Sequence, residues 1–308
     1  MMTTDYELVI IGGGVAGLTA GMYAARSQLK VILIEKLMPG GQILSSDWVE
    51  NYPGFPEGIN GADLSQRTAE QAIRFGLPIQ SDEVLGITLK DHIKIIQLSN
   101  RIITTQALII ATGASPRKLN VPGEDNFFGK GVATCATCDG PFYKNRIVAA
   151  IGGGDTAVQE SAYLTRFVQK LYLIHRRDEL RATAILQERI KTNPKIEIIW
   201  NSVVTEVHGK DKLESITLQN TKTKTFQEVK VDGCFVWVGI IPNTQWLKQL
   251  VALDSTGFVV VNANMETSVP GIYAAGDVRN TPLRQLATAV GDGAIAAVSA
   301  QHYIESFK

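Results

Sequence analysis

The stretch LVIIGGGVAG, residues 8–17, decides the fold of this 308-residue chain. Its four apolar residues predict a buried strand, the glycines follow with the spacing G-x-G-x-x-G, and residues 18–27 are typical of a helix. Gly12 permits a tight turn, Gly14 lets a pyrophosphate approach the backbone, and Gly17 lets the helix pack on the sheet. We therefore expect a dinucleotide-binding unit at the start of the chain.

A second apolar strand, residues 31–34, ends at Glu35. A carboxylate at this place can accept hydrogen bonds from both hydroxyls of an unphosphorylated adenosine ribose. A lone glycine pattern would be weak evidence, but here strand, glycines, helix, strand and acid come in the order that such a unit requires.

The same design returns in the middle of the chain, where a strand at 147–151 leads into GGGDTA at 152–157. The next strand, 171–174, is followed by basic residues rather than by an acid: His175, Arg176, Arg177 and Arg181. Guanidinium groups pair with phosphate through forked, charge-assisted hydrogen bonds, so this unit is predicted to prefer NADPH over NADH. The alternative is a solvated basic helix start, although a helix N-terminus favours acids over arginines.

Two of the three cysteines, Cys135 and Cys138, stand in TCATCDG at 134–140, just before the second glycine loop. The pair can be a redox dithiol, half of a zinc site or a structural staple. No second Cys-x-x-Cys or suitably spaced histidine supplies further zinc ligands, and a staple across so short a loop would stabilise little. We interpret the pair as a redox dithiol, expect no metal site, and interpret Cys234 as an inert core thiol.

Composition narrows the function classes. Thirty basic residues balance thirty acidic ones, so no net field attracts nucleic acid or an anionic membrane. No apolar run approaches the roughly 20 residues that cross a bilayer, and the N-terminal sequence has no secretory signal pattern. We expect a soluble cytoplasmic protein that binds neither nucleic acid nor membrane.

The order of the motifs predicts an α/β fold with two Rossmann-like domains, the second inserted within the first. Proline residues after a buried strand at 107–110 mark the way out of the first domain, and residues 238–243 mark the return. We expect residues 1–115 and 245–308 to form the first dinucleotide-binding domain, which the resemblance described below implies to be FAD-binding, and residues 116–244 to form an NADPH-binding domain that carries the cysteines.

Each domain is also expected to carry a small antiparallel layer. Alternating residues predict a hairpin between Ser81 and Thr105 and a similar layer between Val203 and Val231. A short strand ending in Gly276-Asp277, followed by a helix from Gln285 to about Tyr303, is assigned to the first domain.

Over nearly its whole length the chain resembles the small, bacterial-type thioredoxin reductases. The motifs that carry the resemblance are GGGVAG at 12–17, GGQ at 40–42, ENYPG at 50–54, TG at 112–113, CATCDG at 135–140, GGGDTA at 152–157, HRR at 175–177 with Arg181, GDV at 276–278 and RQ at 284–285. The resemblance implies a homodimeric FAD enzyme that uses NADPH to reduce thioredoxin.

The resemblance also implies the residues at each site. The expected FAD contacts are Gly12, Gly14, Ala16, Gly17, Glu35, Lys36, Gly41, Gln42, Ile43, Asn51, Val84, Thr112, Gly113, Gly276, Asp277, Arg284, Gln285 and Leu286. The expected NADPH contacts are Gly152, Gly154, Asp155, Thr156, Ala157, His175, Arg176, Arg177 and Arg181. In this scheme Cys138 lies nearer the flavin, Cys135 attacks the partner disulfide and Asp139 is the acid; Asp139 could instead be a helix cap.

Two other functions stay open on the sequence. One is an NADPH-flavin reductase that acts on ferredoxin, a peroxiredoxin system or another dithiol protein, with the cysteine pair incidental. The other is a redox-sensing module that binds nucleotides without turnover.

Overall fold

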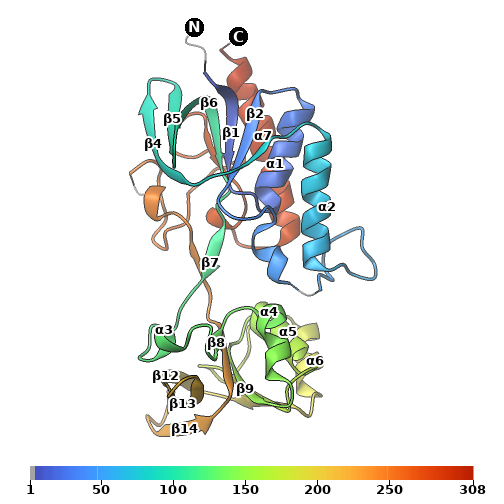
Figure 1. The fold of residues 1–308 in the computed structure, drawn as a ribbon, viewed down its shortest axis with the longest axis vertical. Coiled ribbons are helices and arrows are strands. Elements are labelled where there is room, and N and C mark those ends of the chain that lie inside the picture. The colour runs from blue at the N-terminus through green and yellow to red at the C-terminus, as the bar shows by residue number, and fades with distance from the viewer. Residues whose placement is uncertain (1–3, 47, 248, 308) are drawn as a thin grey trace. The chain divides into compact units, whose positions relative to one another are not determined.

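The computed structural model describes residues 4–46, 48–247 and 249–307, and the chain forms two compact units (Figure 1). Residues 1–3 of the expected first domain and Lys308 lie outside the described residues. The chain passes from the first unit to the second after Ser115 and returns after Ile240. Residues 241–244, expected in the second unit, belong to the first because Thr244 Oγ1 donates to Gly257 O (2.7 Å) and Asn243 Nδ2 to Thr112 O (2.8 Å).

A parallel sheet with the order β3-β2-β1-β6-β17 forms the centre of the first unit. Its strands are β1 (Tyr6–Ile11), β2 (Val31–Glu35), β3 (Ile79–Ser81), β6 (Ile102–Ile110) and β17 (Ile272–Ala274). Leu8 and Ile10 of β1 belong to a core cluster shared with residues of α1 and α7, and Val9 and Ile11 to a cluster on the opposite face. Burial on both faces explains why the strand is a continuous apolar run.

Three helices lie together along the sheet of the first unit in Figure 1: α1 (Val15–Arg26), α2 (Gly61–Arg74) and α7 (Leu286–Glu305). An antiparallel layer, β4 (Val84–Lys90) and β5 (Ile93–Leu98), continues from the first half of β6. The long strand β6 therefore belongs to both the antiparallel layer and the parallel sheet, because residues 102–105 pair with β5 and residues 108–110 pair with β17. The expected hairpin in this region is confirmed.

The second unit repeats the plan with a parallel sheet in the order β11-β10-β9-β15-β8. Its strands are β8 (Val132–Ala133), β9 (Ile147–Gly152), β10 (Lys170–Ile174), β11 (Ile196–Ile199) and β15 (Gly233–Trp237), and its helices are α3 (Glu124–Phe127), α4 (Ala136–Asp139), α5 (Asp155–Leu164) and α6 (Ala184–Lys191). A three-stranded antiparallel sheet follows, formed by β12 (Ser202–Gly209), β13 (Leu213–Asn220) and β14 (Phe226–Lys230).

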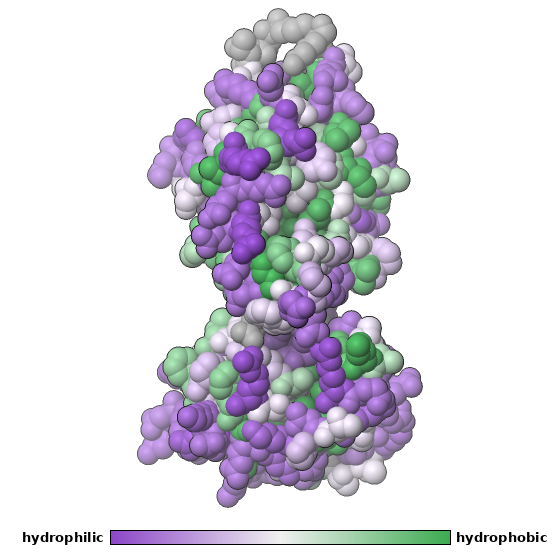
Figure 2. Space-filling view, turned by 90° about the vertical axis from the view of Figure 1, so that its right-hand side faces the viewer, coloured by the Kyte–Doolittle hydropathy of each residue, from purple (hydrophilic) through white to green (hydrophobic). Residues whose placement is uncertain are grey.

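Short elements complete the chain. The 3-10 turns are η1 (Gly41–Ser45), η2 (Gly140–Tyr143), η3 (Gln245–Leu247) and η4 (Gly276–Val278), and β7 (Ala114–Pro116) pairs with β16 (Ile240–Pro242) where the chain leaves and re-enters the first unit. Every helix among the described residues is too short or too polar to span a membrane. On the face shown in Figure 2, hydrophilic residues predominate on both units and hydrophobic ones are scattered among them.

Lys94 of β5 is a charged residue inside the first unit, with 2% of its surface exposed. Its Nζ donates to the carbonyl oxygens of His92 (3.1 Å) and Gln106 (2.7 Å) and lies 4.8 Å from the ring centroid of Tyr303 on α7. No carboxylate of the described residues forms an ion pair with it. Burial therefore lowers the pKa of Lys94 to about 8.

We expect Lys94→Met to stabilise the protein at neutral pH, by at most about 3 kcal/mol, because the wild type then holds a buried charge. As the pH rises from about 8 to about 10.4, the folded chain loses a proton that the unfolded chain keeps. The free energy of unfolding of the wild type therefore increases relative to that of the variant. Urea unfolding at several pH values measures this difference. Lys90→Met, on the exposed part of the same hairpin, is the control, and a difference that does not change with pH would contradict the prediction.

Candidate cofactor-binding and dithiol sites

The first glycine loop leaves open space at the N-terminus of α1. Gly12 has a φ of +104°, and a Cβ added there or at Gly17 would overlap a backbone carbonyl group, of Ala111 and of Gly12 respectively. A Cβ added at Gly14, the N-cap residue of α1, would meet nothing within 4 Å, and no side chain caps the helix. The N–H groups of the first turn therefore face a space that suits an anionic group.

Glu35 is held beside this loop at the carboxyl end of β2. Its Oε2 accepts a hydrogen bond from Gly13 N (2.5 Å) and its Oε1 accepts one from Leu37 N (2.8 Å). The neighbouring Lys36 instead forms a 2.7 Å ion pair with Glu83, one residue before the start of β4 at Val84. This exposed pair adds little stability.

Hydrogen bonds in the first unit join residues that are distant in the sequence. Asn51 Nδ2 donates to Gln285 Oε1 (2.9 Å), and Gln285 also caps α7 in a capping box with Thr288. Gln42 Nε2 donates to Ala114 O, and Thr112 Oγ1 donates to the carbonyl oxygen of Asn243 (3.1 Å). The structure thus brings together residues from the beginning, the middle and the end of the first unit.

Asp277 lies in the turn η4, at the carboxyl end of β17. Burial raises the pKa of its carboxyl group, and the positive charge of Arg284 acts in the opposite direction. The guanidinium of Arg284 lies 4.0 Å from the ring centroid of Phe258, and its Nε is buried without a hydrogen-bond partner among the described residues. A bound group that accepts hydrogen bonds would satisfy this donor.

Other expected FAD contacts shape the loops through packing or backbone conformation. Ala16 and Ile43 are 6% and 5% exposed, and Leu286 packs on the cluster that contains Ile43. Glycines with positive φ occur at the remaining positions: Gly41 (+64°), Gly113 (+65°) and Gly276 (+76°). At these positions a side chain would strain the backbone.

The second glycine loop has the same open position. Gly154 is the N-cap residue of α5, and the atom nearest to a Cβ added there is Nη2 of Arg181, at 4.0 Å. The backbone holds Arg181 in place, because its N–H donates to Gly153 O (2.7 Å), and Thr183 N donates to Asp155 Oδ1 (2.7 Å). Thr156 and the buried Ala157 follow in the first turn of α5.

Arg176, Arg177 and Arg181 are all exposed, and they precede α6 rather than begin it. Among the described residues, none of them forms an ion pair with a carboxylate. Their positive charges therefore stay available to an anionic ligand.

His175 differs from the three arginines in its burial, with only 5% of its surface exposed. Its ring fills the space that a side chain at Gly153 would need, and Nδ1 donates to Gly152 O (2.8 Å). Burial lowers the pKa of His175, so the ring is neutral at pH 7. The side chain that the sequence groups with the arginines expected to bind phosphate thus packs against the glycine loop and supports it.

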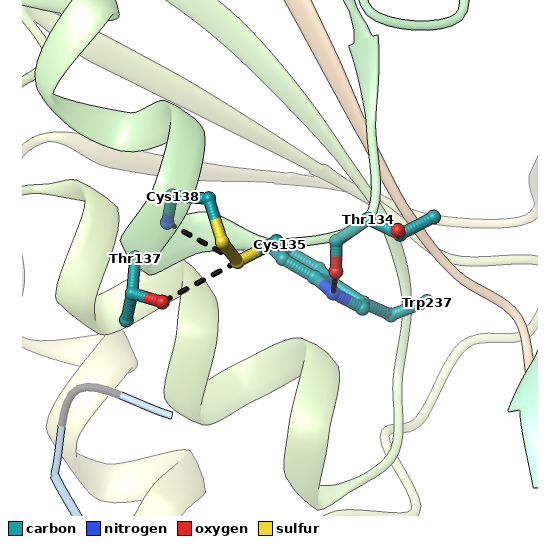
Figure 3. The surroundings of a disulfide bond; sticks show 5 residues. All are labelled: Thr134, Cys135, Thr137, Cys138 and Trp237. Atoms are coloured by element: carbon teal, nitrogen blue, oxygen red, sulfur yellow. Dashed lines mark hydrogen bonds between the residues drawn. A yellow bond between two sulfur atoms is a disulfide. The ribbon is translucent and has the colours of Figure 1, made fainter. Parts of the chain in front are cut away.

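Cys135 and Cys138 form a disulfide at the start of α4, with their Cα atoms 5.4 Å apart (Figure 3). Sγ of Cys135 accepts a hydrogen bond from Cys138 N (3.1 Å) and lies 3.4 Å from Thr137 Oγ1. Trp237 Nε1 donates to Thr134 O (3.0 Å) and fixes the entry to the turn. Cys138 is exposed and Cys135 is half-buried.

Asp139 follows the disulfide directly and is half-buried. Burial raises the pKa of its carboxyl group, and its side chain makes no helix-capping hydrogen bond. The geometry therefore favours a proton-holding carboxyl group over a cap. Cys234 is fully buried, and burial raises the pKa of its thiol to about 12, which makes it inert.

Sequence reasoning missed two residues that support the first unit's loops. Asn243 bonds the backbone of Thr112, and Asp292 of α7 accepts a hydrogen bond from Gly276 N (3.0 Å). The one signal in the sequence for Asp292 was an acid within a helix of small, apolar residues.

The family model for pyridine nucleotide-disulphide oxidoreductases matches residues 6–293, and the chain belongs to this family. It is 42% identical over 304 residues to the thioredoxin reductase of Bacillus subtilis (strain 168), covering 98% of this chain and 96% of that one. It is 43% identical over 307 residues to the thioredoxin reductase of Treponema pallidum (strain Nichols), with 100% of both chains covered.

Solved structures agree with these relatives. A Lactococcus lactis thioredoxin reductase structure is 43% identical, with a TM-score of 0.96 over 98% of this chain and 100% of that one. The structure of the T. acidophilum thioredoxin reductase is 35% identical with a TM-score of 0.93 over 99% of this chain and 100% of that one. The family assignment and the two-domain Rossmann-like fold are confirmed, and membership implies the use of a flavin and a pyridine nucleotide.

Proposed function

We propose that this chain is a thioredoxin reductase that transfers electrons from NADPH through FAD and the Cys135/Cys138 pair to the disulfide of thioredoxin. The observation that carries the proposal is the Cys135–Cys138 disulfide, with Cys138 exposed and Cys135 half-buried, in one of the two Rossmann-like units of a chain with full-length likeness to thioredoxin reductases. A second functional class, an NADPH-flavin reductase with another acceptor, would give this disulfide no role.

FAD fits the first unit. The open space above Gly14 suits the pyrophosphate, Glu35 suits the ribose hydroxyls, and the unpartnered Nε of Arg284 offers a donor close to Asp277 and Gln285. The flavin, when bound, supplies the two-electron chemistry that links a nicotinamide to a disulfide. The chain contributes the loops and side chains that hold it.

NADPH fits the second unit, where Gly154 leaves room at the N-terminus of α5 and Arg181 lies beside that space. Exposed guanidinium groups without carboxylate partners suit a 2′-phosphate, which NADH lacks. His175, neutral and buried, supports this loop and adds no charge to it.

The reduced cysteine pair would carry out thiol–disulfide exchange. The thiolate of Cys135, stabilised by the N–H of Cys138, attacks one sulfur of the thioredoxin disulfide and forms a mixed disulfide. Cys138 then attacks Sγ of Cys135, which releases the second thioredoxin thiolate and restores the Cys135–Cys138 bond. Asp139, with its raised pKa, holds the proton that a leaving thiolate takes.

The proposal extends to a cytoplasmic homodimer. Apolar side chains are exposed on the packed helices α1 and α7, namely Tyr23 (36%), Ile295 (42%) and Val298 (41%). These residues offer apolar area that a second copy of the chain can cover.

The central experiment uses the purified protein. We expect a yellow flavin spectrum, a dimer in gel filtration, bleaching by NADPH and recovery of the colour with oxidised thioredoxin. Cys135→Ser should keep the bleaching and the reduction of artificial acceptors but lose thioredoxin reduction by a factor of at least about 10³. Cys234→Ala, which changes the inert thiol, is the control. Thioredoxin turnover that survives in Cys135→Ser would favour the flavin reductase with another acceptor.

For the second unit, we expect Arg181→Gln to raise the KM for NADPH about tenfold to a hundredfold, because a charge-assisted hydrogen bond to the 2′-phosphate is lost. The KM for NADH should stay nearly constant. Steady-state kinetics with both nucleotides measure the ratio. Lys212→Gln removes the same charge at another exposed position of this unit, and an equal effect of both variants would argue against a phosphate site at Arg181.

For the acid, we expect turnover with thioredoxin to decline as the pH rises through the pKa of Asp139, because only the protonated carboxyl group can donate. Asp139→Asn should lower kcat about tenfold to a thousandfold and lose this pH limb, while flavin reduction by NADPH is unchanged. The pH–rate profiles of wild type and variant test the role. Asp211→Asn serves as the exposed control, and an identical alkaline limb in Asp139→Asn would assign it to another group.

A further inference from the structure

Arg279 and Asp292 form a buried ion pair in the first unit, with side-chain exposures of 15% and 7%. The guanidinium contacts the carboxylate at two points, since Nε donates to Oδ2 (2.7 Å) and Nη2 donates to Oδ1 (2.6 Å). A forked pair of this kind fixes the relative orientation of its two side chains as well as their separation. Taking both charges out of water costs free energy, so the pair is weak evidence for stability alone.

The pair also forms hydrogen bonds with the backbone at each end of the turn η4. Oδ2 of Asp292 accepts a third hydrogen bond, from Gly276 N (3.0 Å), and Nη1 of Arg279 donates to the carbonyl oxygen of Asn280 (2.9 Å). Gly276 and Arg279 border the turn η4 on either side of Asp277 and Val278. One carboxylate on α7 therefore holds the start of this turn directly and its end through Arg279.

The turn η4 and the helix α7 both contribute residues to the proposed FAD site. Asp277 lies at the centre of the turn, and Gln285 caps the N-terminus of α7, about two helical turns before Asp292. Gly276 is itself held close to α1, because a Cβ at this position would lie 2.9 Å from the Cβ of Ala16. A shift of η4 relative to α7 would therefore change the position of Asp277 relative to Gln285.

We infer that Arg279 and Asp292 are positioning residues of the FAD site: their fork fixes η4 against α7, so that Asp277 and the start of α7 meet the same flavin nucleotide. The inference rests on the proposed placement of FAD in the first unit. Neither residue needs to touch the cofactor. They position the cofactor-binding residues indirectly. Asp292 holds the backbone at Gly276, and Arg279 holds the backbone directly after Val278.

The test compares Asp292→Asn with wild type as holoproteins. The amide keeps the shape of the side chain but loses the charge and one acceptor, so the two-point contact with Arg279 cannot form in either orientation of the amide. We expect the Kd for FAD, measured from the fluorescence of flavin released on dilution, to rise about tenfold or more. Hydrogen exchange of the peptide that contains Gly276 should also become faster in Asp292→Asn.

Ile304→Val is the matched control, because Ile304 is a fully buried core residue near the far end of the same helix. It should lower thermal stability without changing the Kd for FAD or the exchange at Gly276. Arg279→Lys is the milder variant in case Asp292→Asn does not fold. It keeps the charge but loses the fork, and should give an intermediate rise in Kd.

A wild-type Kd and unchanged exchange at Gly276 in Asp292→Asn or Arg279→Lys would overturn the inference. An equal rise in Kd in Ile304→Val would also overturn it, because the effect would then follow general destabilisation. If wild-type protein bound no FAD, the proposed function would fail instead, and the exchange at Gly276 would still show whether Asp292 holds the turn.

Discussion

Both units depend on the close approach of a helix N-terminus to the carboxyl edge of a parallel sheet. In each, a glycine loop follows a buried strand, and the N-cap glycine, Gly14 or Gly154, lies beside open space without a capping side chain. The uncapped N–H groups and the helix dipole then have no partner within the helix, and an anionic group can supply one. Most other features of the two sites serve to hold these loops or to distinguish their ligands.

The two loops are supported by side chains of opposite chemistry. In the first unit the Glu35 carboxylate accepts the N–H of Gly13, whereas in the second the neutral ring of His175 donates to the carbonyl oxygen of Gly152. In each unit the supporting group stands at or just after the carboxyl end of the strand that comes next after the glycine loop and its helix, β2 or β10, so a duplicated design uses one structural position in two ways. In the proposed function the acid also accepts hydrogen bonds from the ribose hydroxyls, while recognition of the second nucleotide falls to the exposed arginines after the buried histidine.

The dithiol lies in the unit that is proposed to bind the nicotinamide, at the start of the short helix α4. Cys135 is half-buried, and its Sγ accepts the N–H of Cys138, a contact that would favour a thiolate in the reduced state. The raised pKa of Asp139 places a proton donor directly after the pair. Cys234, the third cysteine, has the opposite setting, since complete burial keeps it protonated and out of reach.

The sequence by itself determined the two nucleotide-binding units, their nesting and the redox pair. These features depend on short-range patterns, because a strand followed by closely spaced glycines, or two cysteines three residues apart, needs no distant partner to be recognised. One boundary differed from the sequence prediction, because residues 241–244 belong to the first unit, where Asn243 and Thr244 bond to residues in its two separate segments.

Only the tertiary structure decided which side chains are exposed beside the glycine loops and which are buried and support them. His175 stands beside Arg176 in the sequence, yet it is buried while the arginine is exposed, because its ring bonds a carbonyl group 23 residues away. Asn51 meets Gln285, and Asp292 holds Gly276, through contacts between elements far apart in the chain. Such contacts arise from the packing of helices on sheets, and no local pattern of residues encodes them.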